Sequence, residues 1–231
     1  MKDKAKFVIT LFTRAARLGQ VKKRLAVDTG KQVALLTHRF LVDKTLRALE
    51  GYAGAELQVW VDDLCNLHSE DPLCSRQLRL IAQKGESLGE RMENAIRRNL
   101  KNGKIPIVIG SDCPSMNAVY IQAAKAALQS DFDVVIGPAE DGGYVLIGMK
   151  QIHTSLFEEI DWGTENVLVQ TLAAAKKLDL RVHVLEVLWD VDRVEDLHKL
   201  SALNLPHYPG ALREFGRADT ESRAIYASTI S

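Results

Sequence analysis

The sequence predicts an α/β fold in which a mostly parallel central sheet is covered by helices on both faces. Three observations carry this prediction. Short apolar runs rich in Val, Ile and Leu alternate along the chain with longer stretches of helical periodicity. The 231 residues, 46% of them hydrophobic, suffice for one sizeable core. No internal repeat or low-complexity linker divides the chain, so we expect a single domain over residues 1–205.

The chain begins with a strand, a helix and a second strand. The continuous apolar run KFVITLF (6–12) is typical of a buried strand. Apolar residues then recur at helical spacing over residues 31–51, and Gly51 supplies the stop. AELQVWV (55–61) predicts the second strand, so the order strand, helix, strand is established early.

The next segment repeats this order. LRLIAQ (78–83) predicts a strand, and KIPIVIG (104–110) predicts another. Between them, Ser87 and Glu90 have the spacing of a capping box ahead of an apolar-periodic run, which predicts a helix over 87–103.

The C-terminal half continues the alternation. In chain order we expect a helix at 117–129, strands at 132–137 and 144–150, a helix at 164–178, a strand at 181–187 and a helix at 192–203. The stretch from 206 to 231 is more polar and less periodic. It predicts a C-terminal arm, a short helix or a partly disordered segment.

The charge balance excludes several classes of partner. Thirty basic and thirty acidic side chains leave no net charge to hold nucleic acid or an anionic membrane nonspecifically. We therefore expect no nucleic-acid partner, and any anion has to be bound by a local site. Nothing in the sequence indicates an oligomeric state.

The N-terminus MKDKAKFVITLFTRAARLG imitates a signal peptide, because lysines precede an apolar run. That run is too short for a secretory segment, and no stretch elsewhere is long enough for a membrane helix. We expect a cytoplasmic protein without a membrane span. Cys65, Cys74 and Cys113 form no CxxC motif and are odd in number, so disulfides and structural zinc are not expected.

Ligands of open parallel sheets gather at the carboxyl ends of the strands, so the loops after the strands are the places to search. The loop RLGQVKKRLA (17–26) follows the first strand and clusters Lys22, Lys23 and Arg24. A flexible loop of this kind is suited to a diphosphate or triphosphate, although basic loops are more often solvated surface. The loop lacks both the GxxxxGK[ST] spacing and the GxGxxG fingerprint. Neither a P-loop ATPase nor a dinucleotide-binding Rossmann domain is therefore supported.

Carboxylates follow two other predicted strands. Asp112 in SDCPS follows the strand at 104–110, where a carboxylate suits a hard cation that bridges to phosphates. Ordinary turn chemistry also explains an aspartate at this position. Asp190 and Asp192 in WDVDRVEDL follow the strand at 181–187. Asp192 with Glu195 also has the spacing of a capping box, which is a purely structural role.

Two further loops have the same ambiguity. Gln83 and Gly85 end a predicted strand, where they could meet a base or a ribose. The stretch GPAEDGGYVLIG (137–148) is explained by a hairpin turn, since Asp-Gly and Gly-Gly supply the positive φ angles of tight turns. It also lies at the sheet edge that the other candidate loops share.

In combination, the motifs resemble a bacterial family of nucleotide-diphospho-sugar transferases with a Rossmann-like GT-A fold, described as glycosyltransferases. The resemblance spans roughly residues 5 to 200. The blocks that carry it are, in order, GxxKxRL, QxGxxLGERM, GSDCP, GPAEDGGYxLIG, FxxIxWGT and DVDxxEDL. The chain is more distantly similar to 2-phospho-lactate guanylyltransferases and molybdenum-cofactor guanylyltransferases.

The resemblance implies roles for residues in the matching blocks. The residues implied to contact nucleotide phosphates are Gly19, Lys22 and Arg24. The carboxylates implied to hold Mg²⁺ or Mn²⁺ are Asp112, Asp190 and Asp192. The first of these is also the carboxylate on which turnover is expected to depend most.

The glycine loop is implied to line the acceptor side. Gly142 and Gly143 let backbone approach the sugar or phosphate, and Glu140 or Asp141 is the expected base for an acceptor hydroxyl. Trp162 and Thr164 are either a wall of the acceptor pocket or, more simply, packing and a helix N-cap.

Three functions fit these residues. A glycosyltransferase uses a nucleotide-sugar donor and a small-molecule acceptor, and it releases a nucleoside diphosphate. A nucleotidyltransferase joins a nucleoside triphosphate to a sugar phosphate or phospho-acid and releases pyrophosphate; the basic loop favours it. A protein that only binds nucleotides is the third alternative, and the three carboxylates argue against it.

Overall fold

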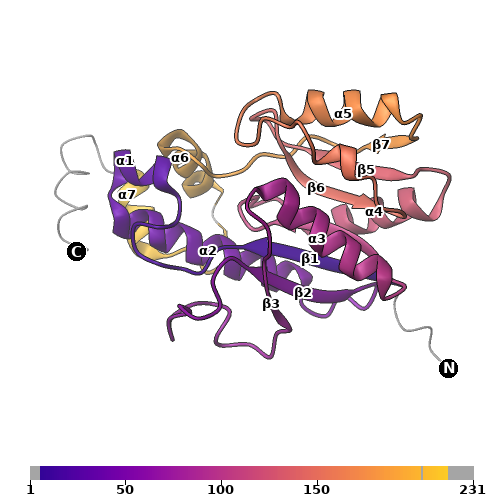
Figure 1. The fold of residues 1–231 in the computed structure, drawn as a ribbon. Helices are drawn as coiled ribbons and strands as arrows, with labels where there is room; N and C mark the ends of the chain where they lie inside the picture. Colours follow the sequence, from indigo (N-terminus) through magenta and orange to yellow (C-terminus); the bar gives the residue numbers. More distant parts are fainter. Residues whose placement is uncertain (1–5, 204, 218–231) are drawn as a thin grey trace.

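Seven strands form a single sheet in the computed structural model, which describes residues 6–203 and 205–217 (Figure 1). The strands are β1 (Phe7–Thr13), β2 (Glu56–Val61), β3 (Leu80–Ala82), β4 (Ile105–Gly110), β5 (Val134–Pro138), β6 (Tyr144–Met149) and β7 (Val182–Val184). Their order across the sheet is β3-β2-β1-β4-β6-β5-β7.

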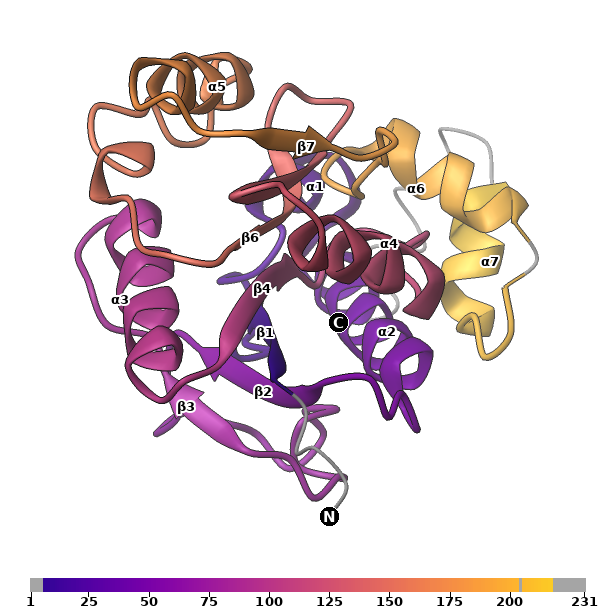
Figure 2. The same cartoon turned by 90° about the vertical axis from the view of Figure 1, so that its right-hand side faces the viewer.

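Helices cover both faces of this sheet. They are α1 (Lys23–Thr29), α2 (Lys31–Leu49), α3 (Leu88–Lys101), α4 (Ala118–Gln129), α5 (Val167–Lys177), α6 (Val194–Ala202) and α7 (Gly210–Arg217), with a short 3₁₀ helix η1 (Thr154–Leu156). Figure 2 shows α3 and α5 on one side of the sheet and α2 and α4 on the other.

Each face of the sheet buries its own hydrophobic core. Val42 and Leu46 of α2 and Ile121 of α4 belong to the core on one face. Met92 and Ile96 of α3 belong to the core on the other. The α/β class predicted from alternating apolar runs is therefore confirmed, and each predicted strand and helix is present with small differences at its ends.

The sheet is parallel except for β6, which is antiparallel to both β4 and β5 within the described residues. Ile147 of β6 is paired with Val108 on one side and with Ile136 on the other. The connection 139–143 is too short for a crossover helix, so β5 and β6 form a hairpin. The hairpin interpretation of GPAEDGGYVLIG is confirmed.

The basic segment 17–26, which the sequence predicts as a flexible loop, becomes helical at Lys23, where α1 begins. Leu25 is fully buried and Thr29 is 1% exposed. Burial of this small apolar face compensates for a helix too short to be stable alone. The prediction of a flexible loop is wrong from Lys23 onward.

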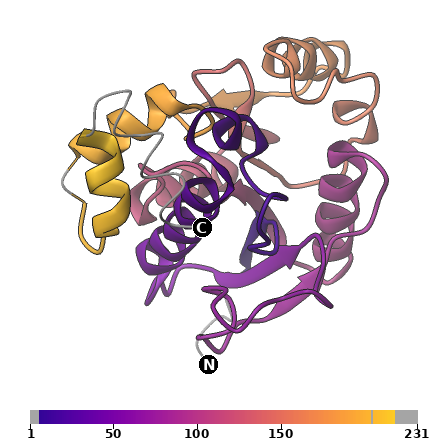
Figure 3. The same ribbon diagram turned by 90° about the vertical axis from the view of Figure 1, so that its left-hand side faces the viewer.

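The C-terminal part of the structure is also helical. Leu212 and Phe215 of α7 are fully buried, in a cluster that includes Phe40 of α2. Figure 3 shows α6 and α7, at the yellow end of the colour bar, beside the indigo and purple helices α1 and α2. The expected arm at 206–231 therefore includes a packed helix, whereas residues 218–231 lie outside the described residues. No helix in the described part of the chain combines the length and apolar character needed to cross a membrane.

Candidate functional site

A cleft opens at the carboxyl ends of β1 and β4. Figure 1 shows α1 and α6 beyond this end of the sheet. The polar lobe of the cleft has a volume of about 670 Å³, and its lining includes Arg14, Lys22, Lys23, Arg24, Gln83, Arg91, Asp112 and Asp192. Its apolar lobe has a volume of about 230 Å³, and its lining includes Met92, Val108, Tyr144, Ile147, Trp162, Val167, Asp141 and Asp190. The lobes adjoin, because Phe12, Leu88, Gly110 and Gly163 line both.

Lys22 and Asp112 form an ion pair at the floor of the polar lobe. Lys22 Nζ lies 2.8 Å from Asp112 Oδ1 and donates a hydrogen bond of 2.5 Å to the Val191 carbonyl oxygen. The Lys22 side chain is 3% exposed, whereas that of Asp112 is 47% exposed and opens toward the cleft. The ammonium predicted to contact phosphate is thus already bound to protein oxygens.

The backbone of Lys22 is in the left-handed region, with φ of 47° and ψ of 47°. This conformation is uncommon for a residue with a side chain and costs about 1 kcal/mol or more. It lies at the end of the turn that begins α1, and it directs the ammonium beneath the cleft. The strain is offset by the buried ion pair and by the hydrogen bond to Val191.

His38 of α2 is a member of this site that the sequence interpretation missed. Its ring is 3% exposed, and Nε2 is 3.1 Å from the Arg14 carbonyl oxygen. Burial lowers the pKa of His38, although the charge of Asp112 opposes this effect. The only signal in the sequence is a histidine within the apolar stripe of the helix, between Leu35 and Leu41.

The pKa of Asp112 lies below its usual value. Partial burial favours the neutral acid, but the positive charge of Lys22 and its hydrogen bond to the carboxylate outweigh this effect. Asp112 therefore presents an ionised carboxylate to the cleft at neutral pH, as a metal ligand or a charge-stabilising group requires.

Arg24 joins α1 to two other parts of the site. Its guanidinium pairs with Asp192 at 2.8 Å and donates to the Gly163 carbonyl oxygen at 3.3 Å. Both partners of the ion pair are substantially exposed, so it contributes at most about 1 kcal/mol to stability.

Asp192 does not cap α6. The helix begins at Val194, so its third residue is Asp196, whose Oδ2 accepts hydrogen bonds from Asp192 N and Arg193 N at 3.0 and 2.8 Å. The expected capping box of Asp192 with Glu195 is wrong by one residue, and the Asp192 side chain is left for Arg24.

Two cations of the polar lobe are uncommitted. In the described part of the chain, neither Arg14 nor Lys23 forms an ion pair through its side chain. Arg91 lines the same lobe and donates from Nε to the Gly85 carbonyl oxygen at 2.9 Å. Five basic side chains, Arg14, Lys22, Lys23, Arg24 and Arg91, and four acidic ones, Asp62, Glu86, Asp112 and Asp192, line the lobe, which leaves an excess of one positive charge for an anionic ligand.

Gln83 lines the polar lobe, but its amide is engaged. Nε2 donates to the carbonyl oxygens of Thr13 and Trp60 at 3.1 and 2.9 Å, which ties the end of β1 to β2. A contact with a base would have to use the remaining amide oxygen. Gln83 thus both supports the sheet edge and presents an acceptor to the lobe.

Gly19 and Gly85 have conformational roles outside the lining of either lobe. Gly19 has φ of +73° in the turn before α1. Gly85 has φ of +133°, and a Cβ there would lie 2.9 Å from the Arg91 backbone nitrogen. Beside it, Ser87 caps α3, since Ser87 Oγ accepts from Glu90 N at 3.1 Å, as the sequence predicts.

The β5–β6 hairpin forms one wall of the apolar lobe. Asp141 and Gly143 line the lobe, and Asp141 Oδ1 accepts a hydrogen bond from Gly143 N at 2.9 Å. Gly142 instead packs against the segment before α5, with φ of +86° and its carbonyl oxygen 2.9 Å from Leu168 N. The stretch that is a turn is therefore also part of the cleft.

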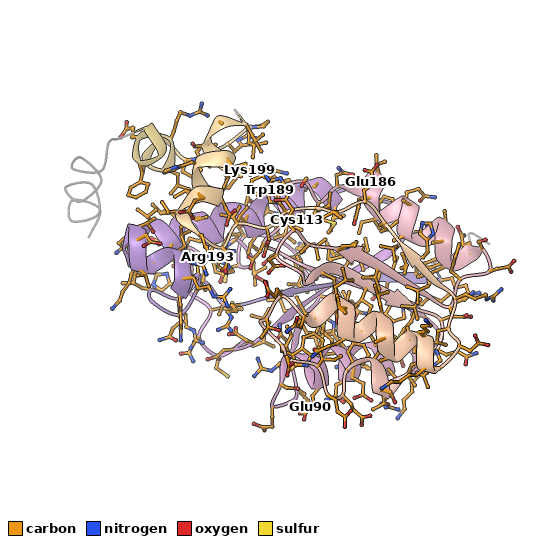
Figure 4. All side chains as sticks on the ribbon, turned by 90° about the horizontal axis from the view of Figure 1, so that it is seen from above. Glu90, Cys113, Glu186, Trp189, Arg193 and Lys199 are labelled. Atoms are coloured by element: carbon orange, nitrogen blue, oxygen red, sulfur yellow. The ribbon has the colours of Figure 1, made fainter. Side chains whose placement is uncertain are left out.

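Glu140 is separated from this wall by its partner. Its carboxylate pairs with Lys199 of α6 at 3.1 Å, and it lines neither lobe. Lys199 Nζ lies 4.3 Å from the centre of a Trp189 ring, and Figure 4 shows these two side chains next to each other. Of the two acidic residues predicted as a base, only Asp141 lines the cleft.

Trp162 and Thr164 both line the apolar lobe. Trp162 meets Tyr144 edge to face, with ring centroids 6.1 Å apart. Thr164 does not cap α5, whose N-cap is Asn166; its hydroxyl donates to the Asp161 carbonyl oxygen at 2.8 Å. The expected threonine N-cap is wrong, because the helix begins two residues later.

Asp190 concentrates negative charge between the lobes. Burial, followed by the charges of Asp141 and Asp112, raises the pKa of Asp190 to about 6. Three carboxylates that influence one another in this way favour a cation nearby. Oxygen ligands of this kind suit Mg²⁺, which commonly uses one or two protein carboxylates.

The predicted metal set is brought together only in part. Asp112 and Asp190 interact electrostatically, whereas Asp192 pairs with Arg24. No group of three or more His, Cys, Asp or Glu side chains in the described ranges is arranged to hold a metal ion. Asp112 and Asp190 are therefore the two carboxylates of the predicted metal set that interact electrostatically.

Comparison with known families gives one match. Residues 45–164, about half of the chain, match the family described as an uncharacterized protein conserved in bacteria (DUF2064). A search of curated proteins gives no match.

Solved structures share the fold. A protein of Desulfovibrio desulfuricans G20, provisionally assigned as a nucleotide-diphospho-sugar transferase, is 29% identical with a TM-score of 0.80, covering 98% of this chain and 96% of that one. CMP:2-keto-3-deoxy-manno-octonic acid synthetase in complex with CTP is 16% identical with a TM-score of 0.53, covering 86% and 98%. Glucosyl-3-phosphoglycerate synthase from Mycobacterium tuberculosis, in complex with Mg²⁺ and UDP, is 10% identical with a TM-score of 0.50, covering 87% and 75%.

Proposed function

The chain belongs to the DUF2064 family of bacterial proteins, and for this member we propose a metal-dependent transferase that moves a glycosyl group from a nucleotide diphosphate sugar to a hydroxyl acceptor. The observation that carries the proposal is the two-lobed cleft. A cationic lobe adjoins an apolar lobe, with carboxylates facing both. The similarity to the Desulfovibrio desulfuricans protein supports the donor class.

The polar lobe is suited to the diphosphate of the donor. Arg14 and Lys23 are free to neutralise phosphate oxygens, and Arg14 can do so with two parallel hydrogen bonds. Lys22 acts from beneath, because it holds Asp112 and the segment at Val191 in position. Arg24 can turn from Asp192 to a phosphate at little cost, since their ion pair is exposed.

Asp112 and Asp190 would hold Mg²⁺ or Mn²⁺ in this site. When bound, the cation would supply positive charge to the leaving diphosphate. Burial and the neighbouring negative charges raise the pKa of Asp190, and a bound cation would stabilise its ionised form. The two carboxylates would also orient a ligand that binds between the lobes.

The transfer requires a base at the acceptor. In the proposed step, the bond between the anomeric carbon and the diphosphate oxygen breaks, and the nucleoside diphosphate leaves with the electron pair. The acceptor oxygen forms a bond to the same carbon and gives its proton to a carboxylate. Asp141 fits this role because it lines the apolar lobe and its side chain is exposed there.

Nucleotidyl transfer is the second candidate. It is favoured by Arg14 and Lys23, two cations of the polar lobe without an ion-pair partner in the described residues, which suit the phosphates of a nucleoside triphosphate. In this reaction a phosphate oxygen of the second substrate attacks the α-phosphorus, and pyrophosphate leaves. The same cleft serves both reactions, and the released product distinguishes them.

Metal-dependent nucleotide binding tests the proposed site. Calorimetry with nucleoside triphosphates and UDP-, GDP- and TDP-sugars should detect a ligand whose affinity rises with Mg²⁺ or Mn²⁺ and falls when EDTA is added. The double variant Arg14→Gln/Lys23→Gln should bind this ligand about tenfold more weakly, because two uncommitted phosphate contacts are lost.

The matched control for that experiment is Lys176→Gln/Lys177→Gln, which removes two lysines from the end of α5. It should bind the same ligand as tightly as the natural protein does. Absence of binding by every nucleotide with and without metal, or equal weakening in both double variants, would contradict the proposed site.

The catalytic base is tested by Asp141→Asn. We expect turnover to fall by about a hundredfold with little change in melting temperature, because an amide cannot take up the proton but still accepts the hydrogen bond from Gly143 N. Free nucleoside diphosphate and pyrophosphate should both be measured, since they report glycosyl and nucleotidyl transfer respectively.

Glu140→Gln is the control, because its carboxylate pairs with Lys199 outside the lobes. Its turnover should stay within about threefold of the natural value, since loss of an exposed ion pair costs at most about 1 kcal/mol. An Asp141→Asn protein with full activity, or a larger loss in Glu140→Gln, would remove Asp141 from the proposed role.

A further inference from the structure

The apolar lobe becomes more hydrophobic with depth. Met92, Val108 and Ile147 line it and are 5%, 3% and 1% exposed, so they form its buried end. Trp162 and Tyr144 add aromatic surface. A sugar or other polyol placed against these side chains would bury several hydroxyls without partners, each at a cost of about 1–3 kcal/mol. The interior of the lobe therefore disfavours polyols.

The acidic side chains and the threonine of the lobe lie at its open end, whereas the Tyr144 hydroxyl is buried. Asp141 and Thr164 are exposed and Asp190 is half-buried. The Thr164 hydroxyl donates to the Asp161 carbonyl oxygen, and Asp190 belongs to the pair that would hold the cation, so Asp141 is the carboxylate left for the acceptor. This carboxylate accepts hydrogen bonds and repels anions, so it favours a ligand that offers a hydroxyl and disfavours one that carries a phosphate or carboxylate beside it.

Leu88 extends the apolar surface toward the opening of the lobe. It is the first residue of α3, it lines both lobes, and it is 47% exposed. An apolar ligand that leaves the lobe past Leu88 would cover this surface. The volume of about 230 Å³ suits a single ring with a short chain, since an apolar cavity of about 150 Å³ takes up benzene.

We propose that the acceptor of this transferase is a small alcohol with an apolar body, of the size of one aromatic ring or a short branched chain, whose hydroxyl meets Asp141 at the mouth of the apolar lobe. The acceptor is neither a sugar nor a phosphorylated compound. This assignment rests on the proposed function. The donor sugar then lies where the lobes join, and the product is an alkyl or aryl glycoside.

The test uses 2-phenylethanol as the apolar alcohol, with glucose and glucose 1-phosphate as polar alternatives. Ligand-observed saturation-transfer NMR on the full chain, without nucleotide, measures the affinity of each. We expect 2-phenylethanol to bind at least tenfold more tightly than either polar compound. Saturating UDP, CDP or GDP should not displace it, because the nucleotide occupies the polar lobe.

Leu88→Ser should weaken 2-phenylethanol binding about fivefold, because part of the apolar wall is removed. Leu178→Ser is the matched control: Leu178 is 42% exposed at the end of α5 and lines neither lobe. The affinity of the Leu178→Ser variant for 2-phenylethanol should be unchanged. Melting curves of both variants, expected to agree with the natural protein within a few degrees, establish that the comparison is between folded chains.

The outcomes separate this inference from the proposed function. Binding of glucose or glucose 1-phosphate as tight as that of 2-phenylethanol, equal affinities in the two leucine variants, or displacement of 2-phenylethanol by a nucleotide would each overturn the assignment of the lobe. If no nucleotide binds while 2-phenylethanol binds in a Leu88-dependent manner, the proposed function fails and the ligand class of the lobe is supported.

Discussion

Replacing Asp112 by asparagine should lower turnover about a thousandfold and the free energy of unfolding by about 2 kcal/mol. Asp112 is the carboxylate that faces the cleft, pairs with the buried Lys22 at 2.8 Å and raises the pKa of Asp190. A neutral amide is a poorer ligand for a hard cation and leaves the developing charge of the leaving group less compensated.

The loss of stability has a separate cause. Removing one partner of a buried ion pair typically costs about 3–5 kcal/mol, because the other charge is left without compensation. The cost here is smaller, since Asp112 is 47% exposed and Lys22 keeps its hydrogen bond to the Val191 carbonyl oxygen. Chemical denaturation measures this loss in the free energy of unfolding. The product assays for nucleoside diphosphate and pyrophosphate measure turnover.

Asp192→Asn is the matched control, since it makes the same chemical change in an exposed ion pair with Arg24. It should cost less than about 1 kcal/mol of stability and less than tenfold in turnover. If Asp192→Asn lowers turnover as much as Asp112→Asn does, the metal set implied by the family resemblance, which includes Asp192, is favoured over the pair Asp112 and Asp190. If neither substitution affects turnover, the proposed site is contradicted.

Gly142→Ala should lower the free energy of unfolding by about 4 kcal/mol and the melting temperature by about 10 °C. Gly142 has φ of +86°, and a Cβ there would lie 2.2 Å from the Glu165 carbonyl oxygen. The left-handed backbone contributes about 1 kcal/mol of strain, and separating the hairpin from the segment before α5 contributes about 3 kcal/mol more. Thermal unfolding followed by circular dichroism measures the effect.

Two other glycines separate the causes. Gly51 has φ of +73° with open space around it, so Gly51→Ala reports the backbone strain alone and should cost about 1 kcal/mol. Gly143 is outside the left-handed region, and its Cβ would lie 3.1 Å from Asp141 Oδ1, which can move. Gly143→Ala should therefore fold normally and weaken binding in the apolar lobe. Equal losses of stability in all three variants would show that contact with Glu165 is not the cause.

The residues of the 140–143 connection have different roles. Gly142 fastens the hairpin to the first turn of α5, because its carbonyl oxygen accepts a hydrogen bond from Leu168 N, whereas Asp141 and Gly143 face the apolar lobe. Glu140 points to Lys199 and fastens the same hairpin to α6. The stretch is therefore held from two sides, which positions Asp141 without giving it a structural partner other than the backbone of Gly143.

Apolar periodicity and capping residues predict the α/β class, the strands and helices in their order, and the sheet edge where the candidate site lies. This information is local, because apolar periodicity and capping residues report on the segment that contains them. Ser87 caps α3 as predicted, and the loop that contains Asp112 lies at the end of β4 as expected. The hairpin predicted for the glycine loop is present, and Asp141 and Gly143 of the same loop line the apolar lobe.

The pairing of the charged residues, in contrast, is visible only in the folded chain. Lys22, Arg24 and Glu140 have the same sequence signature as free site residues, yet they are bound to Asp112, Asp192 and Lys199. These partners are distant in the chain, and no periodicity connects them. Which charges remain free for a ligand is a property of the folded arrangement, since an ion pair depends on the distance between two atoms in space and not on their separation in sequence.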